Sequence, residues 1–366
     1  MKVEIVTLHR ITNFGSMLQT LATQYAVEKL GYEAEVLDFV PEGMTFRRAC
    51  FPKNAAPFSR KLIKCFPLFV VNTVQFHILD RFLHRYIHLS ASRYGSFSAI
   101  LRNVPEADIY MTGSDQVWNT QNNNPREDYL AYFLAFVPEE KKRISYAGSF
   151  GKNTFTEDER QTIKTYLKKY AAVSVREDEA LDILEDNGIA GGMQVVDPTL
   201  LLSPSEWDTF LDVKPPRPGY IFVYNLNRNP LLKSLAHEIS KEKNLRIVNF
   251  ADSLDFVRGA DNRLFNTAVD FLNHIKYADI VLTDSFHGTA FSLNYSKQFV
   301  CVPAPRYNSR IESILRMVGL SSRLICDSES GLSAANDAIP YTEVSEKIDA
   351  MRDSSVLFLR RVLQNG

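Results

Sequence analysis

The sequence predicts an α/β protein with two doubly wound domains that face a cleft, and three observations support this prediction. Short apolar runs typical of buried parallel strands alternate with helical patterns along most of the chain. The alternation pauses at 212–219, where three prolines and one glycine fall within eight residues, as in an interdomain linker. At 366 residues the chain is also longer than one hydrophobic core usually supports. We expect an N-terminal domain over 1–211 and a C-terminal domain over 220–335.

The N-terminal half begins as a strand, a helix and a second strand, and Gly31 marks the end of the helix because glycine commonly follows helices. An insertion then separates this opening from four further strands. Ser203 precedes Pro204 and stands three residues before Glu206, a pattern that predicts a capped helix start. The expected strands are 3–8, 34–39, 107–112, 143–147, 172–175 and 193–196, and the expected helices are 17–30, 157–169 and 177–187.

The C-terminal half repeats the alternation, so both halves predict Rossmann-like domains. The final segment, 336–366, carries a helical pattern near 341–363 that could pack back on the N-terminal domain. The expected strands are 220–224, 245–249, 279–283 and 298–302, and the expected helices are 230–243, 268–277 and 288–295.

The composition is that of an ordinary globular protein, with 45% hydrophobic and 23% charged residues, which excludes disordered and fibrous classes. The chain enters a strand-like run at once, without a signal-peptide pattern, and has no apolar stretch of 18 residues. We therefore expect a cytoplasmic enzyme. The cysteines match no zinc or redox spacing, so we expect free thiols and no metal site; they are Cys50, Cys65, Cys301 and Cys326.

The insertion at about 44–104 is strongly basic and rich in phenylalanine. It holds ten lysines and arginines against one acid, Asp80, whereas the whole chain has a net charge of −1. Helical apolar runs within it argue against disorder. Such a segment could rest on the anionic inner face of a membrane or bind the pyrophosphate of a lipid-linked acceptor. It could also be a solvated face over a buried aromatic side. The acidic remainder and the lack of a recognition motif argue against nucleic acid binding.

The most informative segment is 283–290, with the sequence Thr-Asp-Ser-Phe-His-Gly-Thr-Ala. It lies between an apolar strand and a helix, and in open α/β folds this crossover at the carboxyl end of a strand is where ligands bind. Backbone amides of the first helical turn point at any anion held there. His287 therefore combines a titratable ring with an expected anion site, which favours acid–base chemistry on a phosphate or carboxylate ester.

Two further loops follow predicted strands. The first, 12–16, precedes a helix and can offer backbone amides to a ligand, although such a turn needs glycine or asparagine in any case. The second, 113–119, holds a carboxylate, two amides and an indole, the composition of a sugar site. Within it, Asp115 is the strongest candidate for chemistry. Trp118 could instead be a core residue at the end of a loop.

Arg176 stands at the end of another predicted strand, directly before an acidic helix. Its guanidinium could clamp a phosphate or a carboxylate in a bidentate manner. It could equally be a partner of Glu177, Asp178 or Glu179.

These loops together resemble the polysaccharide pyruvyl transferase family, from Leu8 to about Leu320. Each motif alone is weak, but their order and spacing are specific. The motifs are Asn13-Phe14-Gly15-Ser16-Met17-Leu18-Gln19, Gly113-Ser114-Asp115-Gln116-Val117-Trp118-Asn119, Ser174-Val175-Arg176-Glu177, Asp197-Pro198-Thr199 and Thr283-Asp284-Ser285-Phe286-His287-Gly288.

The resemblance implies a fold similar to the GT-B glycosyltransferases, with phosphoenolpyruvate as co-substrate and no cofactor. It implies transfer of the enolpyruvate group to two hydroxyls of a sugar in a surface polysaccharide or its lipid-linked precursor. We assign His287 as general acid and base, and Asp115 as a second catalytic candidate. The candidate donor-binding residues are Arg176, Ser285, Phe286, Gly288, Thr289, Arg306 and Arg310. The candidate acceptor-binding residues are Asn13, Gly15, Ser16, Gln19, Gln116, Trp118 and Asn119.

This chain departs from the resemblance at one position. Some similar sequences carry an arginine two residues before the histidine, where this chain has Ser285. A cation must then come from elsewhere, and Arg306 and Arg310 are the candidates. Two other functions stay open, a nucleotide-sugar glycosyltransferase of GT-B type and a non-catalytic glycan-binding relative.

Overall fold

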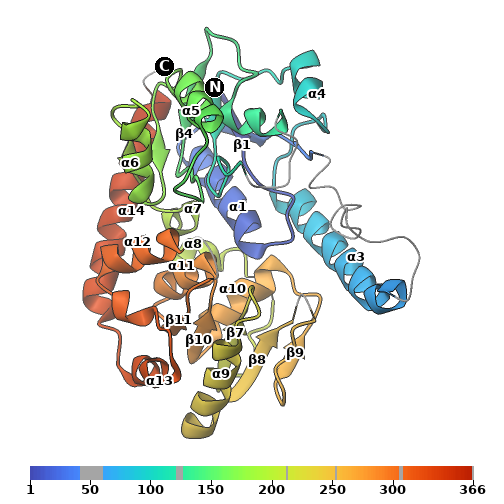
Figure 1. Cartoon of the computed structure of the whole chain (residues 1–366), viewed down its shortest axis with the longest axis vertical. Helices are drawn as coiled ribbons and strands as arrows, with labels where there is room; N and C mark the ends of the chain where they lie inside the picture. The colour runs from blue at the N-terminus through green and yellow to red at the C-terminus, as the bar shows by residue number, and fades with distance from the viewer. Residues whose placement is uncertain (42–60, 121–126, 212, 252–253, 305–307, 365–366) are drawn as a thin grey trace. The chain divides into compact units, whose positions relative to one another are not determined.

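The computed structural model describes residues 1–41, 61–120, 127–211, 213–251, 254–304 and 308–364, with the backbone alone over 61–68. The chain forms two compact units, each made of segments that are separate in sequence (Figure 1). Unit 1 comprises Met1–Pro57, Asp80–Leu201 and Met351–Gly366, and unit 2 comprises Phe58–Leu79 and Leu202–Ala350.

Unit 1 is built on a parallel sheet of four strands in the order β2-β1-β3-β4. Ile109 of β3 pairs with Val3 of β1 on one side and with Lys142 of β4 on the other. All of β3 is buried, as expected of a central parallel strand. A parallel bridge between Gly148 and Val175 continues the pairing toward a two-stranded β5-β6 sheet. The strands are β1 (Lys2–Val6), β2 (Glu33–Val36), β3 (Ile109–Thr112), β4 (Lys142–Ser145), β5 (Ser174–Val175) and β6 (Met193–Gln194).

Helix α1 (Phe14–Lys29) is almost completely buried in unit 1, with 13 of its 16 residues in the buried class. It begins at Asn13, whose side chain accepts hydrogen bonds from the backbone of Gly15 and Ser16. Such a covered helix is fixed in place, so its first turn is a rigid part of the sheet's carboxyl edge. The other helices that include unit 1 residues are α3 (Lys61–Tyr86), α4 (Phe97–Arg102), η2 (Asp128–Phe133), α5 (Glu157–Leu167), α6 (Glu179–Asp186), α7 (Pro198–Leu201) and α14 (Tyr341–Gln364).

Unit 2 is built on a parallel sheet of five strands in the order β11-β10-β7-β8-β9 (Figure 1). The strands are β7 (Tyr220–Tyr224), β8 (Arg246–Phe250), β9 (Asp261–Arg263), β10 (Ile280–Thr283) and β11 (Gln298–Cys301). The helices that begin in this unit after β6 are α8 (Pro204–Asp208), α9 (Pro230–Lys243), α10 (Ala268–Tyr277), α11 (Phe286–Asn294), α12 (Ser309–Val318), η3 (Ser321–Arg323), α13 (Ser328–Asn336) and α14.

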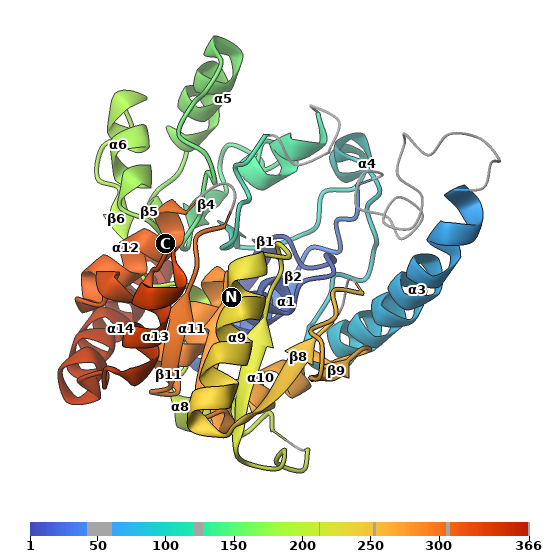
Figure 2. The ribbon, with the colours of Figure 1, turned by 60° about the horizontal axis from the view of Figure 1, so that its bottom comes forward.

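The two faces of β7 show how the unit 2 core forms. Ile221 and Val223 point to one face and join a core cluster with residues of α9. Helix α9 lies in front of the unit 2 sheet in Figure 2. Phe222 and Tyr224 point to the other face, where their rings lie 6.2 and 4.7 Å from Phe271 of α10. Because alternate residues of a strand point to opposite faces, an apolar run such as β7 requires helices on both sides.

The boundary between the units lies earlier in the sequence than the expected linker. Trp207 of α8 is fully buried, with its ring 5.2 Å from that of Phe291 in α11. The side chain of Asn294 donates a hydrogen bond of 2.9 Å to the carbonyl of Leu202. Residues from Leu202 onward therefore belong to unit 2, although we expected the N-terminal domain to extend to residue 211.

Two helices contribute to both units. In α3, Gln75 donates to the carbonyl of Asn266 at 2.8 Å within unit 2, whereas Asp80 accepts from Arg10 within unit 1. Helix α14 belongs to unit 1 from Met351 onward. Among the described residues, none of the helices is both long and apolar enough to span a membrane.

Most expected elements are present with bounds within a few residues. Helices α9 and α10 match the predicted ranges 230–243 and 268–277, and the capping box of Ser203 and Glu206 is formed. The prediction missed β9, which is only three residues long, and α13, which has no strong apolar pattern. Part of the basic insertion, including Cys50, lies outside the described residues. Cys301 and Cys326 are free thiols, as expected.

Candidate functional site

His287 lies in the first turn of α11, directly after β10, and is buried with 5% of its surface exposed. Ser285 caps this helix, and its hydroxyl accepts a hydrogen bond of 3.3 Å from the backbone N–H of Gly288. The ring therefore stands at a helix N-terminus, where the backbone amides favour an anion. This is the strand-to-helix geometry that the sequence predicts.

Gly288 allows α11 to start close against β10. A Cβ atom at this position would lie 2.4 Å from Thr283 Oγ1, and Thr283 cannot move because its hydroxyl donates to the carbonyl of Tyr224 at 2.9 Å. Thr289 is fully buried, and its hydroxyl donates to the carbonyl of Ser285 at 3.1 Å. Gly288 and Thr289 thus both stabilise the turn around His287.

Asp284 anchors a neighbouring loop beside the histidine turn. Its carboxylate accepts the backbone N–H groups of Leu226 and Asn227, both at 2.8 Å, and the Asn227 side chain at 2.9 Å. Burial raises the pKa of Asp284, and these hydrogen bonds partly oppose that rise. We did not single out Asp284 as a site residue, although its position after the strand was the available signal.

Arg310 is placed near the histidine turn through an aromatic contact. Its guanidinium lies 6.0 Å from the centre of the Phe286 ring, and that ring lies 5.2 Å from the His287 ring in an edge-to-face arrangement. Arg310 belongs to the first turn of α12 and is half-buried. Arg306 and Arg310 were the two candidates for the cation that some similar sequences carry at position 285. Arg310 lies close to the histidine turn, and Arg306 lies outside the described residues.

The predicted acceptor residues lie in unit 1, where Asp115 occupies a strained position at the end of β3. Its φ of 75° is in the left-handed region, which non-glycine residues seldom adopt. Its carboxylate accepts from the Ser16 hydroxyl at 2.5 Å and from the Gln116 backbone at 2.8 Å. Strain of this kind persists only where the surroundings enforce it, and it often occurs at functional sites.

Arg176 is a structural centre of unit 1 and not an open clamp. Only 2% of its side chain is exposed, and Nη1 lies 2.7 Å from Asp197 Oδ2. Glu177 and Asp115 each have a carboxylate oxygen 3.8 Å from the guanidinium. Burial lowers the pKa of Arg176, but the three carboxylates outweigh that effect and raise it. This geometry therefore favours the alternative in which Arg176 is a partner of nearby carboxylates such as Glu177. It does not fit the role of a clamp for the donor.

The carboxylates around Arg176 join four loops at the carboxyl edge of the unit 1 sheet. Asp197 accepts from the backbone and the hydroxyl of Thr199 at 3.0 and 2.7 Å, and from the Ser114 hydroxyl at 3.3 Å. Glu177 accepts from the Ser149 hydroxyl at 2.6 Å. The loops after β3, β4, β5 and β6 thus share one polar network. Sequence reasoning noted the Asp197 motif but did not predict this partnership.

Trp118 is a core residue in this structure. It is 1% exposed, its ring centre lies 5.0 Å from that of Phe150, and its indole N–H donates to the carbonyl of Tyr132 at 3.2 Å. A Cβ on Gly148 would lie 2.7 Å from the ring, so the backbone also closes on the indole. The expected stacking of this ring on a sugar does not fit, because the ring faces are covered.

The remaining acceptor candidates divide by exposure. Gln19 is fully buried and donates to Thr7 Oγ1 at 3.0 Å, so it holds α1 against β1. Gln116 is half-buried and accepts from the Asn119 amide at 2.8 Å. Asn13 is half-buried at the cap of α1. Gly15 and Ser16 are buried in the first turn of that helix. Of the seven, Asn13 and Gln116 have the most surface to offer a ligand.

The described residues contain no group of three or more histidines, cysteines and acids that could hold a metal ion. Unit 2 offers a histidine at a helix start with an arginine nearby, and unit 1 offers a strained carboxylate on a rigid edge.

The structure first defines the fold class, two parallel α/β units of the GT-B type, which solved sugar-nucleotide epimerases share. The UDP-GlcNAc 2-epimerase of Neisseria meningitidis, solved with UDP-GlcNAc bound, is 12% identical with a TM-score of 0.54, over all of both chains. The UDP-GlcNAc 2-epimerase of Methanocaldococcus jannaschii is 12% identical with a TM-score of 0.50, also over all of both chains. At these identities the likeness shows the fold alone.

The family follows from the sequence itself. The model of the polysaccharide pyruvyl transferase family matches residues 13–304, which is most of the chain and includes Asn13, Asp115 and His287. The chain therefore belongs to the polysaccharide pyruvyl transferase family. A search of curated proteins finds no match to the chain.

Proposed function

We propose that this transferase moves the enolpyruvate group of phosphoenolpyruvate onto two hydroxyls of one sugar, forming a cyclic pyruvate ketal and releasing phosphate. The sugar belongs to a surface polysaccharide or its lipid-linked precursor. The observation that carries the proposal is His287 at the start of α11 in a chain of this family. Phosphoenolpyruvate bears a phosphate and a carboxylate, and a helix N-terminus suits either group.

The proposed donor site lies on unit 2 around the histidine turn. Backbone amides at the start of α11 would receive one anionic group, and the Arg310 guanidinium would neutralise the other. At position 285 this chain has a serine hydroxyl, whereas some similar sequences have an arginine. The contact of Arg310 with Phe286, and of Phe286 with His287, supports this assignment because it brings the charge close to the catalytic ring.

The reaction needs proton transfers that a histidine can perform. The methylene carbon of the donor takes up a proton while a sugar hydroxyl bonds to C2, and that hydroxyl loses its proton. The C–O bond to phosphate then breaks, and the second hydroxyl bonds to C2 and gives its proton to the departing phosphate. We assign the proton donation to His287, because imidazole titrates near neutral pH and can both give and take protons.

Asp115 is the proposed acceptor of the hydroxyl proton, on unit 1. Its carboxylate already accepts a hydrogen bond from the Ser16 hydroxyl, so a hydroxyl donor of the kind that a sugar supplies fits its chemistry. The left-handed φ of 75° is consistent with the assignment, because such conformations are often found at functional sites. Asn13 and Gln116 are the proposed polar contacts to the sugar.

The proposal includes peripheral contact with the inner face of a membrane, through α3. Its exposed residues among those with described side chains recur at helical spacing, with valines first and arginines toward the end of the helix; they are Val70, Val74, His77, Arg81, His84 and Arg85. A stripe of this kind suits an anionic lipid surface, where each cation contributes about 1 kcal/mol. The cations expected before residue 69 lie outside the described side chains.

The test compares His287→Asn with His237→Asn, a matched change at an exposed histidine of α9. Phosphate release from phosphoenolpyruvate is measured with a panel of glycans that includes galactose-containing ones. We expect His287→Asn to lower kcat about 10²- to 10⁴-fold and His237→Asn to leave it unchanged. Thermal unfolding confirms that both variants are folded. Turnover of His287→Asn at the parent rate would refute the mechanism.

The same purified protein distinguishes the proposed transfer from the two other functions, a nucleotide-sugar glycosyltransferase and a non-catalytic glycan-binding relative. A ligand present at 100 times its Kd stabilises a folded protein by about 2.7 kcal/mol. Phosphoenolpyruvate should raise the unfolding temperature, whereas transfer of the sugar from UDP-GlcNAc to a glycan would favour a nucleotide-sugar glycosyltransferase. Stabilisation by a glycan with no phosphate release would favour a non-catalytic relative.

A further inference from the structure

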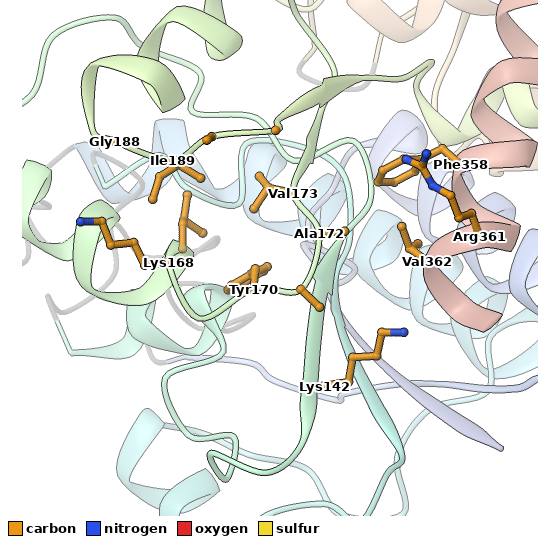
Figure 3. Close-up of a pocket in the computed structure, with 14 residues that line it drawn as sticks. Lys142, Lys168, Tyr170, Ala172, Val173, Gly188, Ile189, Phe358, Arg361 and Val362 are labelled. Carbon is orange, nitrogen blue, oxygen red and sulfur yellow. The ribbon is translucent and has the colours of Figure 1, made fainter. Parts of the chain in front are cut away.

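Unit 1 contains a cavity of about 500 Å³ that the proposed function does not use (Figure 3). Its walls come from the start of β4, the end of α5, the segments that lead into β5 and β6, and the last turns of α14. The described residues that line it are Lys142, Leu167, Lys168, Tyr170, Ala171, Ala172, Val173, Gly188, Ile189, Ala190, Gly191, Phe358, Arg361 and Val362.

The cavity lies at the opposite edge of the unit 1 sheet from Asp115. Lys142 is the first residue of β4, whereas Gly148, beyond the end of this strand, forms the bridge to Asp115. Residues in a strand advance about 3.3 Å each, so the length of β4 alone, Lys142–Ser145, separates the two places by about 10 Å. The cavity is therefore separate from the proposed acceptor residues within the same unit.

The charged side chains that line the cavity are all basic. Lys142, Lys168 and Arg361 line it, and none of the described lining residues is acidic. Burial lowers the pKa of Lys142, so its ammonium is partly withdrawn from solvent. Figure 3 shows Lys142 and Arg361 on the side of Val362, with the amine of Lys168 pointing away from them.

The walls between these cations are apolar and well ordered by packing. Phe358 and Val362 are buried residues of α14, and Val173 and Ile189 are buried on the other side. The Arg361 guanidinium lies 5.9 Å from the centre of the Phe358 ring, which holds the cation at the rim. A volume of about 500 Å³ lies within the usual range for small-ligand pockets, roughly 300–1,000 Å³.

We propose that this cavity binds a phosphorylated small molecule with a ring, such as a nucleotide. Its phosphate would lie between Lys142 and Arg361, and its ring would pack on the apolar wall formed by Phe358 and Val362. The two cations supply charge-assisted hydrogen bonds, and the apolar wall distinguishes a ring-bearing ligand from inorganic phosphate. The site is independent of the donor assignment on unit 2.

The experiment titrates the full chain by calorimetry with AMP, UMP, adenosine and inorganic phosphate. We expect a nucleotide to bind at least about tenfold more tightly than adenosine and than inorganic phosphate, because only the nucleotide uses both the cations and the apolar wall. Lys142→Ala and Arg361→Ala should each weaken the nucleotide at least about tenfold. Saturating phosphoenolpyruvate should not displace it.

The neighbouring residues provide matched controls, because they carry the same charge but do not line the cavity. Lys141→Ala and Arg360→Ala should leave nucleotide affinity within about twofold of the parent. Failure of both nucleotides to bind at millimolar concentration would overturn the proposal. Binding that survives both Lys142→Ala and Arg361→Ala would also overturn it, since the nucleotide would then occupy another site.

Discussion

Arg176→Met tests whether this arginine is a structural centre or a donor clamp. The substitution removes the cation from among Asp115, Glu177 and Asp197, and leaves three carboxylates around a side chain that is only 2% exposed. Removing one partner of a buried ion pair costs about 3–5 kcal/mol, since the charge left behind is uncompensated. For a domain of 150–250 residues, each kcal/mol lowers Tm by about 2–4 °C. We expect a decrease of about 6–20 °C.

The assay is thermal unfolding followed by circular dichroism, with Arg360→Met as control because Arg360 is exposed on α14. Arg176→Lys should fall between the parent and Arg176→Met, because lysine keeps the charge but not the planar group that meets several carboxylates. An Arg176→Met protein that unfolds within about 1 °C of the parent, with a raised KM for phosphoenolpyruvate, would refute the structural interpretation and restore the donor clamp.

Two further predictions concern buried charge and surface charge. Burial, reinforced by the charge of Glu35, raises the pKa of Glu4 to about 9 from 4.5, so the folded state holds a proton that the unfolded state releases. The contribution of this site to the free energy of unfolding is therefore lost as pH rises from about 4.5 to 9. We expect the free energy of unfolding of Glu4→Gln, measured by urea unfolding, to rise relative to that of the parent by up to about 4 kcal/mol between pH 6 and 9. A difference that does not change with pH would contradict this. On α3, the chain should co-sediment with anionic vesicles at low salt, and the double variant Arg81→Ala with Arg85→Ala should bind about 10- to 30-fold more weakly; no binding of the parent at low salt would contradict it.

The sequence was sufficient to predict the parallel α/β architecture because buried strands and amphipathic helices carry local patterns. It was sufficient to place His287 at a strand-to-helix turn for the same reason. The environment of Arg176 was not predictable, since Asp197 and Asp115 are distant in sequence and meet the arginine only when four loops converge. A loop has no periodicity, so nothing local indicated that the Trp118 ring turns into the core.

The unit boundary was misplaced for a related reason. Three prolines and a glycine mark a flexible stretch, but the place where one unit ends depends on which core receives the preceding side chains. Trp207 packs on α11 of unit 2, and this contact is invisible in the local sequence. Short elements such as β9 also lack enough residues to show a pattern.

The most direct test of the proposed transfer is the stoichiometry of ketal and phosphate. The full chain is incubated with phosphoenolpyruvate and the glycan panel, and the products are followed by mass spectrometry of the glycan and by phosphate release. We expect one phosphate released for each pyruvate ketal formed, only with an acceptor present, and both products formed about 10²- to 10⁴-fold more slowly with His287→Asn. Phosphate release without a ketal, or consumption of a nucleotide sugar in place of phosphoenolpyruvate, would contradict the proposed transfer.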